Sequence, residues 1–318
     1  MLKIALFGSS GQLGRRLASD LTGLGVVLAP LRPQLDATNL KSVSQWLTTH
    51  QPDLIVNAIA MTAVDRAEHA PALAQQVNQH FVQQLADYAA AQQVWLLHFS
   101  TDYVFDGTGE APWRETDPCR PLQQYGLSKR AGELAIIASG CPYLILRTSW
   151  LYDTQGHNFL LTMLQIAKQS APQPDYLQAA AAPLQIVSDQ IGAPTYARVL
   201  SAQVAVMLAQ IVSLPPAQVT DYSGIYHLCA SGACSWSEFA KAIFNKACAL
   251  QLLTMPPEVV AISSSQLTRA AVRPKNSRLD TGKTRTMFGL ESPHWQQQLD
   301  QCLRDLKIIA ETGKQSIS

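Results

Sequence analysis

The feature that most constrains the fold is an alternation of short apolar runs with longer segments of helical periodicity. Five apolar runs are predicted to be strands, at residues 3–7, 26–31, 54–58, 94–99 and 143–147. Runs this uniformly apolar favour a parallel sheet that is covered on both faces. The segments between them are predicted to be helices, at 12–24, 40–50, 72–92 and 122–139. With right-handed crossovers, this order predicts an α/β fold with a doubly wound parallel sheet.

Beyond about residue 150 the alternation is less regular. A helix over 158–168 and a strand over 184–187 are expected to extend the sheet, and another strand is expected over 223–229. Ser235 and Glu238 have the spacing of a capping box, which predicts that a helix starts there. A last helix is expected over 294–309. We therefore expect a dinucleotide-binding Rossmann domain at 1–150, with sheet elements continuing to about 222, interleaved with a smaller, mainly substrate-binding α/β region at 151–318.

Composition argues against several classes of function. The formal net charge is +1 and there is no basic block, so nothing points to nucleic acid or to an anionic membrane. The first apolar run is too short for the core of a signal peptide. The apolar stretch at 199–214 is interrupted by polar residues and predicts a buried helix rather than a membrane span. Six scattered cysteines without a C-x-x-C pair are typical of reduced thiols in a cytoplasmic protein.

A glycine-rich turn follows the first predicted strand. The segment FGSSGQLG places Gly8, Gly11 and Gly14 where the strand gives way to a helix. Glycines allow a tight turn there and let backbone N–H groups approach a pyrophosphate at the helix N-terminus. The spacing is G-x-x-G-x-x-G rather than G-x-G-x-x-G, and its position at the first strand–helix junction favours a dinucleotide site.

The end of the second predicted strand bears on the type of dinucleotide. An acidic residue there binds the ribose 2′-hydroxyl of NAD, whereas a basic residue accommodates the 2′-phosphate of NADP. Arg32 lies near this corner and Asp36 lies further on, so the sequence favours NADPH and leaves NADH open. The small residues Ala58 and Ala60 follow the third strand, where they would let a cofactor lie close to the backbone.

Three residues further along the chain form a candidate catalytic group. Thr101 lies at the end of the fourth predicted strand, 24 residues before Tyr125, and Lys129 lies one helical turn after Tyr125. An unperturbed tyrosine has a pKa of about 10, and a neighbouring ammonium group lowers it by stabilising the phenolate. The group therefore predicts that Tyr125 serves as a general acid or base.

Together, the glycine turn, the strand-end hydroxyl and the Y-x-x-x-K pair resemble the extended short-chain dehydrogenase/reductase superfamily. The segments STDYVFDG, YGLSKRAGE, RTSWLY, SDQIGAPT, GIYHLCASG and RPKNSRLD occur in the order found in the dTDP-4-dehydrorhamnose reductase family, and the chain resembles that family over nearly its whole length. The resemblance implies reduction of the 4-keto group of dTDP-4-dehydro-L-rhamnose by NADPH, or by NADH. This is the last step of dTDP-L-rhamnose synthesis, which serves cell-wall or O-antigen polysaccharides.

The resemblance also implies roles for single residues. Thr101, Tyr125 and Lys129 match the catalytic trio, with Lys129 also holding the nicotinamide ribose. Thr101, Asp102 and Trp150 match contacts to the sugar nucleotide, and Trp150 could stack on a sugar or a base. The residues expected to contact the cofactor are Gly8, Gly11, Gln12, Leu13, Arg32, Asp36, Ala37, Ala58, Ile59, Ala60, Tyr125 and Lys129.

The chain departs from the family at one point. Some members dimerise around a divalent metal held by glutamates, one of them on the first helix, but this chain has Arg15 and Arg16 in that region. Near the end of the sheet region it has Arg198 and no carboxylate. We therefore expect no metal site and a monomer or weak homodimer. Residues 170–183 form a longer stretch than is usual for the family, and we assign it no role.

Two other functions fit the same features. One is a sugar-nucleotide epimerase or 4,6-dehydratase of the same superfamily. Dehydratases of this group typically carry Asp-Glu after the threonine, whereas this chain has Asp102 followed by Tyr103. The other is a non-catalytic, reductase-like regulatory subunit, although the intact Thr101, Tyr125 and Lys129 argue against it.

Overall fold

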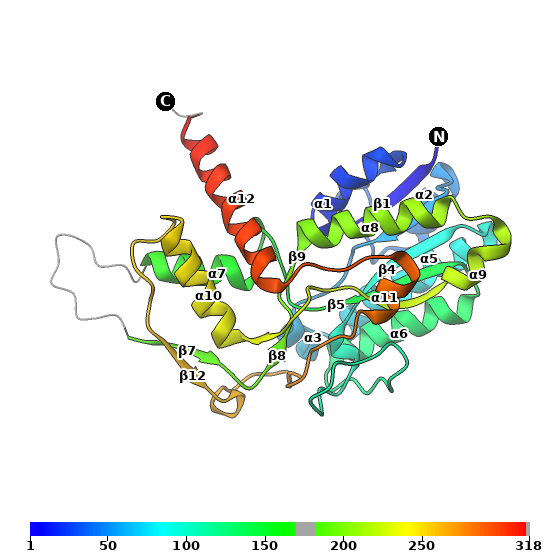
Figure 1. Ribbon diagram of the computed structural model, residues 1–318. Helices are drawn as coiled ribbons and strands as arrows, with labels where there is room; N and C mark the ends of the chain where they lie inside the picture. Colours follow the sequence, from blue (N-terminus) through cyan, green and yellow to red (C-terminus); the bar gives the residue numbers. More distant parts are fainter. Residues whose placement is uncertain (170–181, 316–318) are drawn as a thin grey trace.

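The central element of the structure, a computed structural model that describes residues 1–169 and 182–315, is a six-stranded parallel sheet (Figure 1). The strand order is β10-β5-β4-β3-β1-β2. The strands are β1 (Lys3–Phe7), β2 (Val26–Leu28), β3 (Leu54–Asn57), β4 (Trp95–Thr101), β5 (Tyr143–Thr148) and β10 (Gly224–His227). The predicted fold class is confirmed, and each of the five runs predicted from the first half of the chain is a strand of this sheet.

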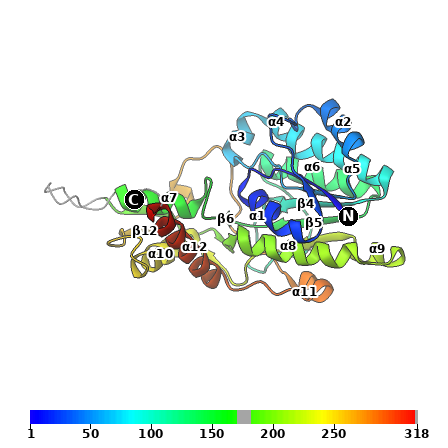
Figure 2. The same ribbon diagram turned by 90° about the horizontal axis from the view of Figure 1, so that it is seen from above.

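Helices cover both faces of the sheet, as Figure 2 shows from above. One face carries α1 (Gln12–Asp20) and α8 (Ala197–Val212), and the other carries α2 (Leu40–His50), α5 (Phe81–Gln92) and α6 (Gln124–Ser139). Successive side chains of a strand point to opposite faces. In β1, Ile4 and Leu6 therefore pack with α1 and α8, while Ala5 and Phe7 pack with α2 and α5. This two-sided burial explains why the strand is apolar throughout.

The predicted helix over 72–92 is interrupted. The chain forms α3 (Val64–His69), which was not predicted, then α4 (Pro71–Gln75), a π-helical turn (Gln76–His80) and α5. The buried side chain of Asn78 lies in this turn. Its Oδ1 accepts a hydrogen bond from the Met61 N–H at 2.9 Å, and its Nδ2 donates to Ser128 Oγ at 3.0 Å. The widened turn therefore coincides with a buried amide that ties the loop after β3 to α6.

The expectation that residues 184–187 extend the main sheet is wrong. The strand β7 (Leu184–Val187) pairs in parallel with β12 (Val259–Ile262) in a separate two-stranded sheet. The sixth place in the main sheet is taken by β10, which pairs with β5. The helix α7 (Phe159–Gln169) packs with α10 (Trp236–Ala249) in a separate core rather than on the main sheet. A short apolar run identifies a strand but carries no information about its partner, which explains the error.

The second half of the chain builds a lobe beside the sheet. Its core joins α7, α10 and α12 (Trp295–Gln315) to the β7–β12 pair. The predicted capping box is confirmed, because Ser235 Oγ accepts from the Glu238 N–H and the Glu238 carboxylate accepts from the Ser235 N–H. The remaining elements are β6 (Leu151–Tyr152) paired with β9 (Thr195–Tyr196), β8 (Ile191–Gly192) paired with β11 (Cys234–Ser235), α9 (Val219–Tyr222) and α11 (Gly282–Phe288).

The two halves of the chain are interleaved at the sheet, because α8 and β10 come from beyond residue 150. The division into domains near residue 150 stays a prediction. Most of the 170–183 stretch, up to residue 181, lies outside the described residues. No helix in the described ranges is both long enough and apolar enough to cross a membrane.

Candidate active site

The glycine turn between β1 and α1 is closely packed. Gly8 has a φ of 92°, which favours glycine, and a Cβ there would lie 2.8 Å from the carbonyl carbon of Ala58. A Cβ on Gly14 would lie 1.9 Å from the Gly8 carbonyl oxygen. Neither position has room for a side chain, so both glycines are required for α1 to begin this close to the strand ends.

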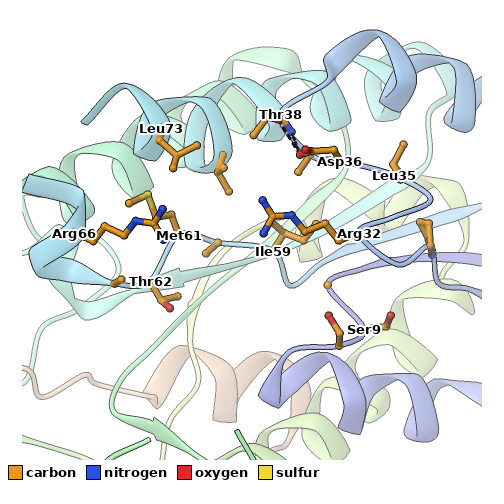
Figure 3. A pocket seen from close by; sticks show the side chains of 17 residues that line it. Ser9, Arg32, Leu35, Asp36, Thr38, Ile59, Met61, Thr62, Arg66 and Leu73 are labelled. Atoms are coloured by element: carbon orange, nitrogen blue, oxygen red, sulfur yellow. Dashed lines mark hydrogen bonds between the residues drawn. The ribbon is translucent and has the colours of Figure 1, made fainter. Parts of the chain in front are cut away.

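A cavity of about 400 Å³ opens beside this turn (Figure 3). Its walls come from the segments that follow β1, β2 and β3. These segments meet at the point where strand order reverses about β1, which is where open α/β sheets bind ligands. Six of the predicted cofactor residues line it: Gly8, Arg32, Asp36, Ala37, Ile59 and Ala60.

The other predicted cofactor residues do not line this cavity. Leu13 is buried in the core between α1 and the sheet. The Gln12 side chain bonds to residues before α7: its Nε2 donates to the His157 carbonyl at 3.3 Å, and its Oε1 accepts from Asn158 Nδ2 at 2.8 Å. Gly11 lies within the glycine turn. The backbone of Ala58 packs against Gly8 of the same turn. The remaining two, Tyr125 and Lys129, belong to the candidate catalytic group.

Two arginines give the cavity its charge. Arg32 from the β2–α2 loop and Arg66 from α3 extend toward each other across it in Figure 3. Neither guanidinium forms a salt bridge within residues 1–169 and 182–315. Such groups suit phosphate oxygens. Arg66 was not predicted, since a single arginine in a helical segment is no different in sequence from a solvated surface residue.

The carboxylate of Asp36 is already engaged. Its Oδ1 accepts hydrogen bonds from the N–H of Thr38 at 2.9 Å and from Thr38 Oγ1 at 2.8 Å. These bonds, aided by the charge of Arg32, lower the pKa of Asp36. The basic side chain of Arg32, rather than a free carboxylate, therefore faces the cavity at the end of β2.

Thr101 and Tyr125 are brought together. Thr101 ends β4 and Tyr125 lies in the first turn of α6, and both are buried. Burial raises the pKa of Tyr125, and hydrogen bonding with the Thr101 side chain opposes this rise. A tyrosine in such a site holds its proton firmly and gives it up only to a strongly basic oxygen, such as one that gains charge in a transition state.

Lys129 makes two contacts that were not predicted, and its role toward Tyr125 stays a prediction. Its Nζ donates to the Phe99 carbonyl at 2.5 Å and lies 3.0 Å from His98 Nε2, both on β4. Its side chain is 1% exposed, and burial lowers its pKa to about 7, opposed by the charge of Glu133. The structure gives Lys129 no hydrogen bond to Tyr125 among the described contacts. A lysine that titrates near neutrality can exchange protons at physiological pH.

Asp102 is a buried acid beside Thr101 and Tyr125. It is 3% exposed, and its Oδ1 accepts from Thr101 Oγ1 at 3.1 Å. Burial raises its pKa to about 7, opposed by hydrogen bonds from Ser277 and Thr101. Its Oδ2 is buried near Ser277 and lacks a well-aligned hydrogen bond among the described residues.

Trp150 has a strained backbone and a covered face. Its φ is 48°, in the left-handed region that side chains other than glycine rarely adopt. Its ring stacks on Trp236, with centroids 3.6 Å apart and an interplanar angle of 8°. A Cβ on Gly192 would lie 2.5 Å from the Trp150 ring. One ring face is therefore taken by Trp236, which sequence reasoning missed, and stacking on a ligand is not available on that face.

A second cavity, of about 240 Å³, is lined mainly by residues of the lobe. It combines aromatic walls with cationic groups. Its lining includes Tyr103, Phe159, Trp236, Gln190, Arg269 and Arg273. Arg273 forms a salt bridge with Asp65 of α3 at 2.6 Å, whereas Arg269 forms none within the described chain. None of these residues was predicted as a site residue.

Tyr125 lines neither cavity, but it packs with residues that do. Its ring meets the ring of Tyr103 edge-on, with centroids 5.7 Å apart, and Tyr103 lines the second cavity. It also shares a hydrophobic cluster with Met61, which lines the first cavity. The phenol is therefore one residue removed from the wall of each cavity.

Salt bridges occupy the region in which the sequence has arginines in place of the expected metal-binding glutamates. Arg16 bonds to Asp153 at 2.7 Å, and Arg198 bonds to Asp305 at 2.7 Å. Over the described ranges, no group of three or more His, Cys, Asp or Glu side chains is placed to hold a metal ion. That the protein binds no metal stays a prediction.

Comparison with known proteins gives matches over nearly the whole chain. The model of the RmlD substrate binding domain family matches residues 2–308. The chain is 38% identical over 300 residues to the dTDP-4-dehydrorhamnose reductase of Salmonella typhimurium, covering 93% of this chain and 95% of that protein. It is 39% identical over 313 residues to that of Aggregatibacter actinomycetemcomitans, covering 98% of this chain and 100% of that protein.

Solved structures agree. The dTDP-4-dehydrorhamnose reductase of Clostridium acetobutylicum superposes with a TM-score of 0.83 at 30% identity, covering 96% of this chain and 100% of that one. That of Bacillus anthracis, solved in complex with NADP, superposes with a TM-score of 0.80 at 31% identity, covering 96% and 99%.

Proposed function

The chain belongs to the dTDP-4-dehydrorhamnose reductase family, and we propose that it reduces the 4-keto group of dTDP-4-dehydro-L-rhamnose with NADPH to give dTDP-L-rhamnose. One observation carries the proposal: Tyr125, paired with Thr101, packs against residues that line two cavities. One cavity has two guanidinium groups without a salt bridge in the described chain, and the other has aromatic and cationic walls. A ketone reductase needs a proton donor at this place, between a dinucleotide and its substrate.

The first cavity fits a dinucleotide phosphate. The turn at Gly8 and Gly14 admits no side chain and brings backbone close to the cavity, where a pyrophosphate can meet the N-terminus of α1. Arg32 stands where the adenosine ribose is expected, so it would hold the 2′-phosphate that distinguishes NADPH from NADH. Arg66 adds a second positive charge on the opposite wall. The complex of the Bacillus anthracis relative with NADP supports this assignment.

The protein's part in the reaction is to bind and protonate the carbonyl oxygen. Bound NADPH supplies the hydride that is added to C4. Thr101 Oγ1 and the Tyr125 hydroxyl would bond to the substrate oxygen, where negative charge grows, and so stabilise the transition state more than the ground state. Tyr125 then transfers its proton to that oxygen. Burial of the pair keeps water out and strengthens both hydrogen bonds.

The second cavity suits the nucleotide end of the substrate. Arg269 is a cation without a salt-bridge partner in the described chain, and Arg273 is beside it, so a diphosphate has two guanidinium groups to bind. Phe159 and Trp236 offer aromatic surface for a base. Trp150, stacked on Trp236, would then contact the sugar by the edge of its ring.

A coupled assay tests the proposal. Purified protein given dTDP-4-dehydro-L-rhamnose should consume NADPH in equimolar amount to the sugar reduced. Tyr125→Phe should lower kcat by about 10²-fold or more, since it removes the proton donor. Tyr88→Phe on α5 removes a hydroxyl outside both cavities and serves as the control. Sugar conversion without net NADPH consumption would indicate an epimerase or dehydratase instead. No turnover with any nucleotide sugar, together with recovery in a larger complex, would indicate a regulatory subunit.

We also propose a cytoplasmic monomer or weak homodimer without a bridging metal. The six cysteines are free thiols, which is typical of a reducing compartment. Arg16 and Arg198 are held in salt bridges in the region where other family members are expected to use glutamates. Sedimentation with Mg²⁺ and then with a chelator tests this, because a metal-bridged dimer would dissociate when the chelator is added.

A further inference from the structure

A chain of buried polar groups runs from the β3 end of the cofactor cavity to the catalytic lysine. Asn57 Oδ1 accepts from the backbone N–H of Ile59 at 3.0 Å. Asn57 Nδ2 lies 3.0 Å from His98 Nδ1, and His98 Nε2 lies 3.0 Å from Lys129 Nζ. The side chains of Asn57 and His98 are 0% exposed, so water cannot replace any of these bonds.

The backbone N–H of Ile59 determines the direction of every bond in the chain. It is a fixed donor, so the oxygen of the Asn57 amide must face it and the NH₂ group must face His98. An amide NH₂ only donates, so His98 Nδ1 must be the acceptor, without a proton. A neutral imidazole then carries its proton on Nε2, where it points at Lys129 Nζ.

An ammonium group at Lys129 conflicts with this arrangement. Its three protons leave no lone pair on Nζ, so Nε2–H and Nζ–H would face each other at 3.0 Å. A neutral amine resolves the conflict, because Nζ accepts from Nε2–H while it still donates to the Phe99 carbonyl. Turning the Asn57 amide over only moves the clash to the N–H of Ile59.

We propose that Asn57 and His98 are positioning residues that hold Lys129 Nζ as a neutral amine in the ligand-free protein. They do so by presenting a hydrogen-bond donor to it. Lys129 then enters the catalytic cycle as a proton acceptor rather than as a permanent cation. The pKa of Lys129 is lowered, which agrees with a neutral amine. Burial and the charge of Lys129 lower the pKa of His98 well below its usual value, which agrees with a neutral ring.

The other charged groups around Lys129 do not reverse this balance. On its own helix, Glu133 is the opposing charge, but its carboxylate is shared by Arg147 and Arg130 at 2.8 and 2.7 Å. Tyr125, one turn before Lys129, holds its proton. After β4, Asp102 is a buried acid whose pKa is raised to about 7. On the side of α5 and its π-helical turn, the uncharged amide of Asn78 bonds to Ser128 of α6.

The use of this device rests on the proposed function. In a ketone reductase Tyr125 loses a proton in every turnover and must regain one. A lysine held at neutral charge can take up a proton near pH 7 and pass it on, whereas a lysine with its ordinary pKa of about 10.4 would seldom release one. Because Ile59 lines the cofactor cavity, a cofactor that shifts this backbone N–H would also loosen the hold on Lys129.

The hydrogen position on His98 can be observed directly, without any assay of activity. Protein labelled with ¹⁵N-histidine is examined by long-range ¹H–¹⁵N NMR at about pH 8, with the His98 signals assigned by their loss in His98→Gln. The inference expects a proton on Nε2 and an unprotonated Nδ1. A proton on Nδ1, or a charged ring, overturns it. This result stands whether or not the protein is a reductase.

Variants then separate control of Lys129 from a merely structural role. In Asn57→Asp, a carboxylate accepts from both Ile59 N–H and His98 Nδ1–H, so the His98 tautomer reverses and Lys129 is favoured as an ammonium. The inflection near neutral pH in the kcat/KM profile should move upward by about one unit or more. Asn39→Asp, at the exposed start of α2, adds the same charge elsewhere and should leave it in place.

His98→Gln is the conservative variant that should preserve the pH dependence. A glutamine can accept from Asn57 with its oxygen and donate to Lys129 with its NH₂, so it keeps the direction of the bonds without a titratable ring. The inflection should stay near its original pH in His98→Gln and should move in His98→Leu. Equal pH profiles in His98→Gln, His98→Leu and Asn57→Asp would contradict the inference, even in a fully active reductase.

Discussion

Asp102→Asn is expected to stabilise the protein at alkaline pH. Burial raises the pKa of Asp102 from 3.8 in the unfolded chain to about 7 in the native state. As pH rises from about 4 to about 7, the unfolded chain has lost this proton while the native state still holds it. Native stability therefore falls with rising pH over this window. An asparagine has the same shape and no proton to lose.

The size of the effect follows from the two pKa values. A difference of about 3 pK units corresponds to roughly 4 kcal/mol once both states are ionised. Part of this is already lost at pH 5, and the part that falls between pH 5 and pH 8 is about 2.5 kcal/mol. The stability advantage of Asp102→Asn over the parent should therefore grow by about 2 to 3 kcal/mol between these two pH values.

Thermal unfolding of both proteins at pH 5 and pH 8 measures this difference of differences. For a chain of this size, 2 to 3 kcal/mol corresponds to a change in Tm of several degrees. Asp106→Asn is the matched control. Hydrogen bonds from Thr108 lower the pKa of Asp106, so this residue is ionised at both pH values. The stability difference between Asp106→Asn and the parent should therefore be the same at pH 5 and pH 8. An advantage of Asp102→Asn that stays constant or shrinks at pH 8 would refute a buried, proton-holding Asp102.

Three further substitutions test the cavities. Gly14→Ala places a methyl group against the Gly8 carbonyl and should weaken NADPH binding at least tenfold in a fluorescence titration, whereas Gly23→Ala, where a Cβ meets nothing within 4 Å, should leave binding unchanged. Arg32→Ala should weaken NADPH binding about tenfold or more and NADH binding much less, since a charged hydrogen bond contributes about 1.5–3 kcal/mol. Equal losses of affinity for the two cofactors would exclude a 2′-phosphate contact. Arg269→Ala should raise KM for the sugar nucleotide at nearly constant kcat, and a selective fall in kcat would argue against a role in nucleotide binding alone.

The parts of the fold that depend on local pattern could be predicted from the sequence. β1 is apolar throughout because helices cover both of its faces, and its bounds were predicted without error. The capping box at Ser235 and Glu238 is a contact between residues three apart, so sequence alone specifies it. Thr101 and Tyr125 could be paired because the ends of parallel strands and the helix that follows meet at one edge of the sheet.

The parts that depend on distant partners could not be predicted. β7 pairs with β12, about 75 residues away, and the apolar residues of β7 do not identify that partner. Trp236 covers Trp150 from α10 of the lobe beside the sheet, and nothing in either local sequence indicates the stack. The contacts of Lys129 Nζ with His98 and the Phe99 carbonyl join α6 to β4, and the spacing of Lys129 from Tyr125 indicates neither partner.

Because α8 and β10 lie late in the sequence, the first half of the chain is synthesised before the elements that complete its sheet and its core. On a ribosome, residues 1–150 emerge with the β5 edge unpaired and with no α8 to cover α1, which later bonds to it through Ser201 and Asp20 at 2.7 Å. An open strand edge and an uncovered apolar face favour association with other chains. We therefore expect the nucleotide-binding half to stay dependent on chaperones until about residue 227 has left the ribosome, and a chain that stops at residue 150 to aggregate rather than fold.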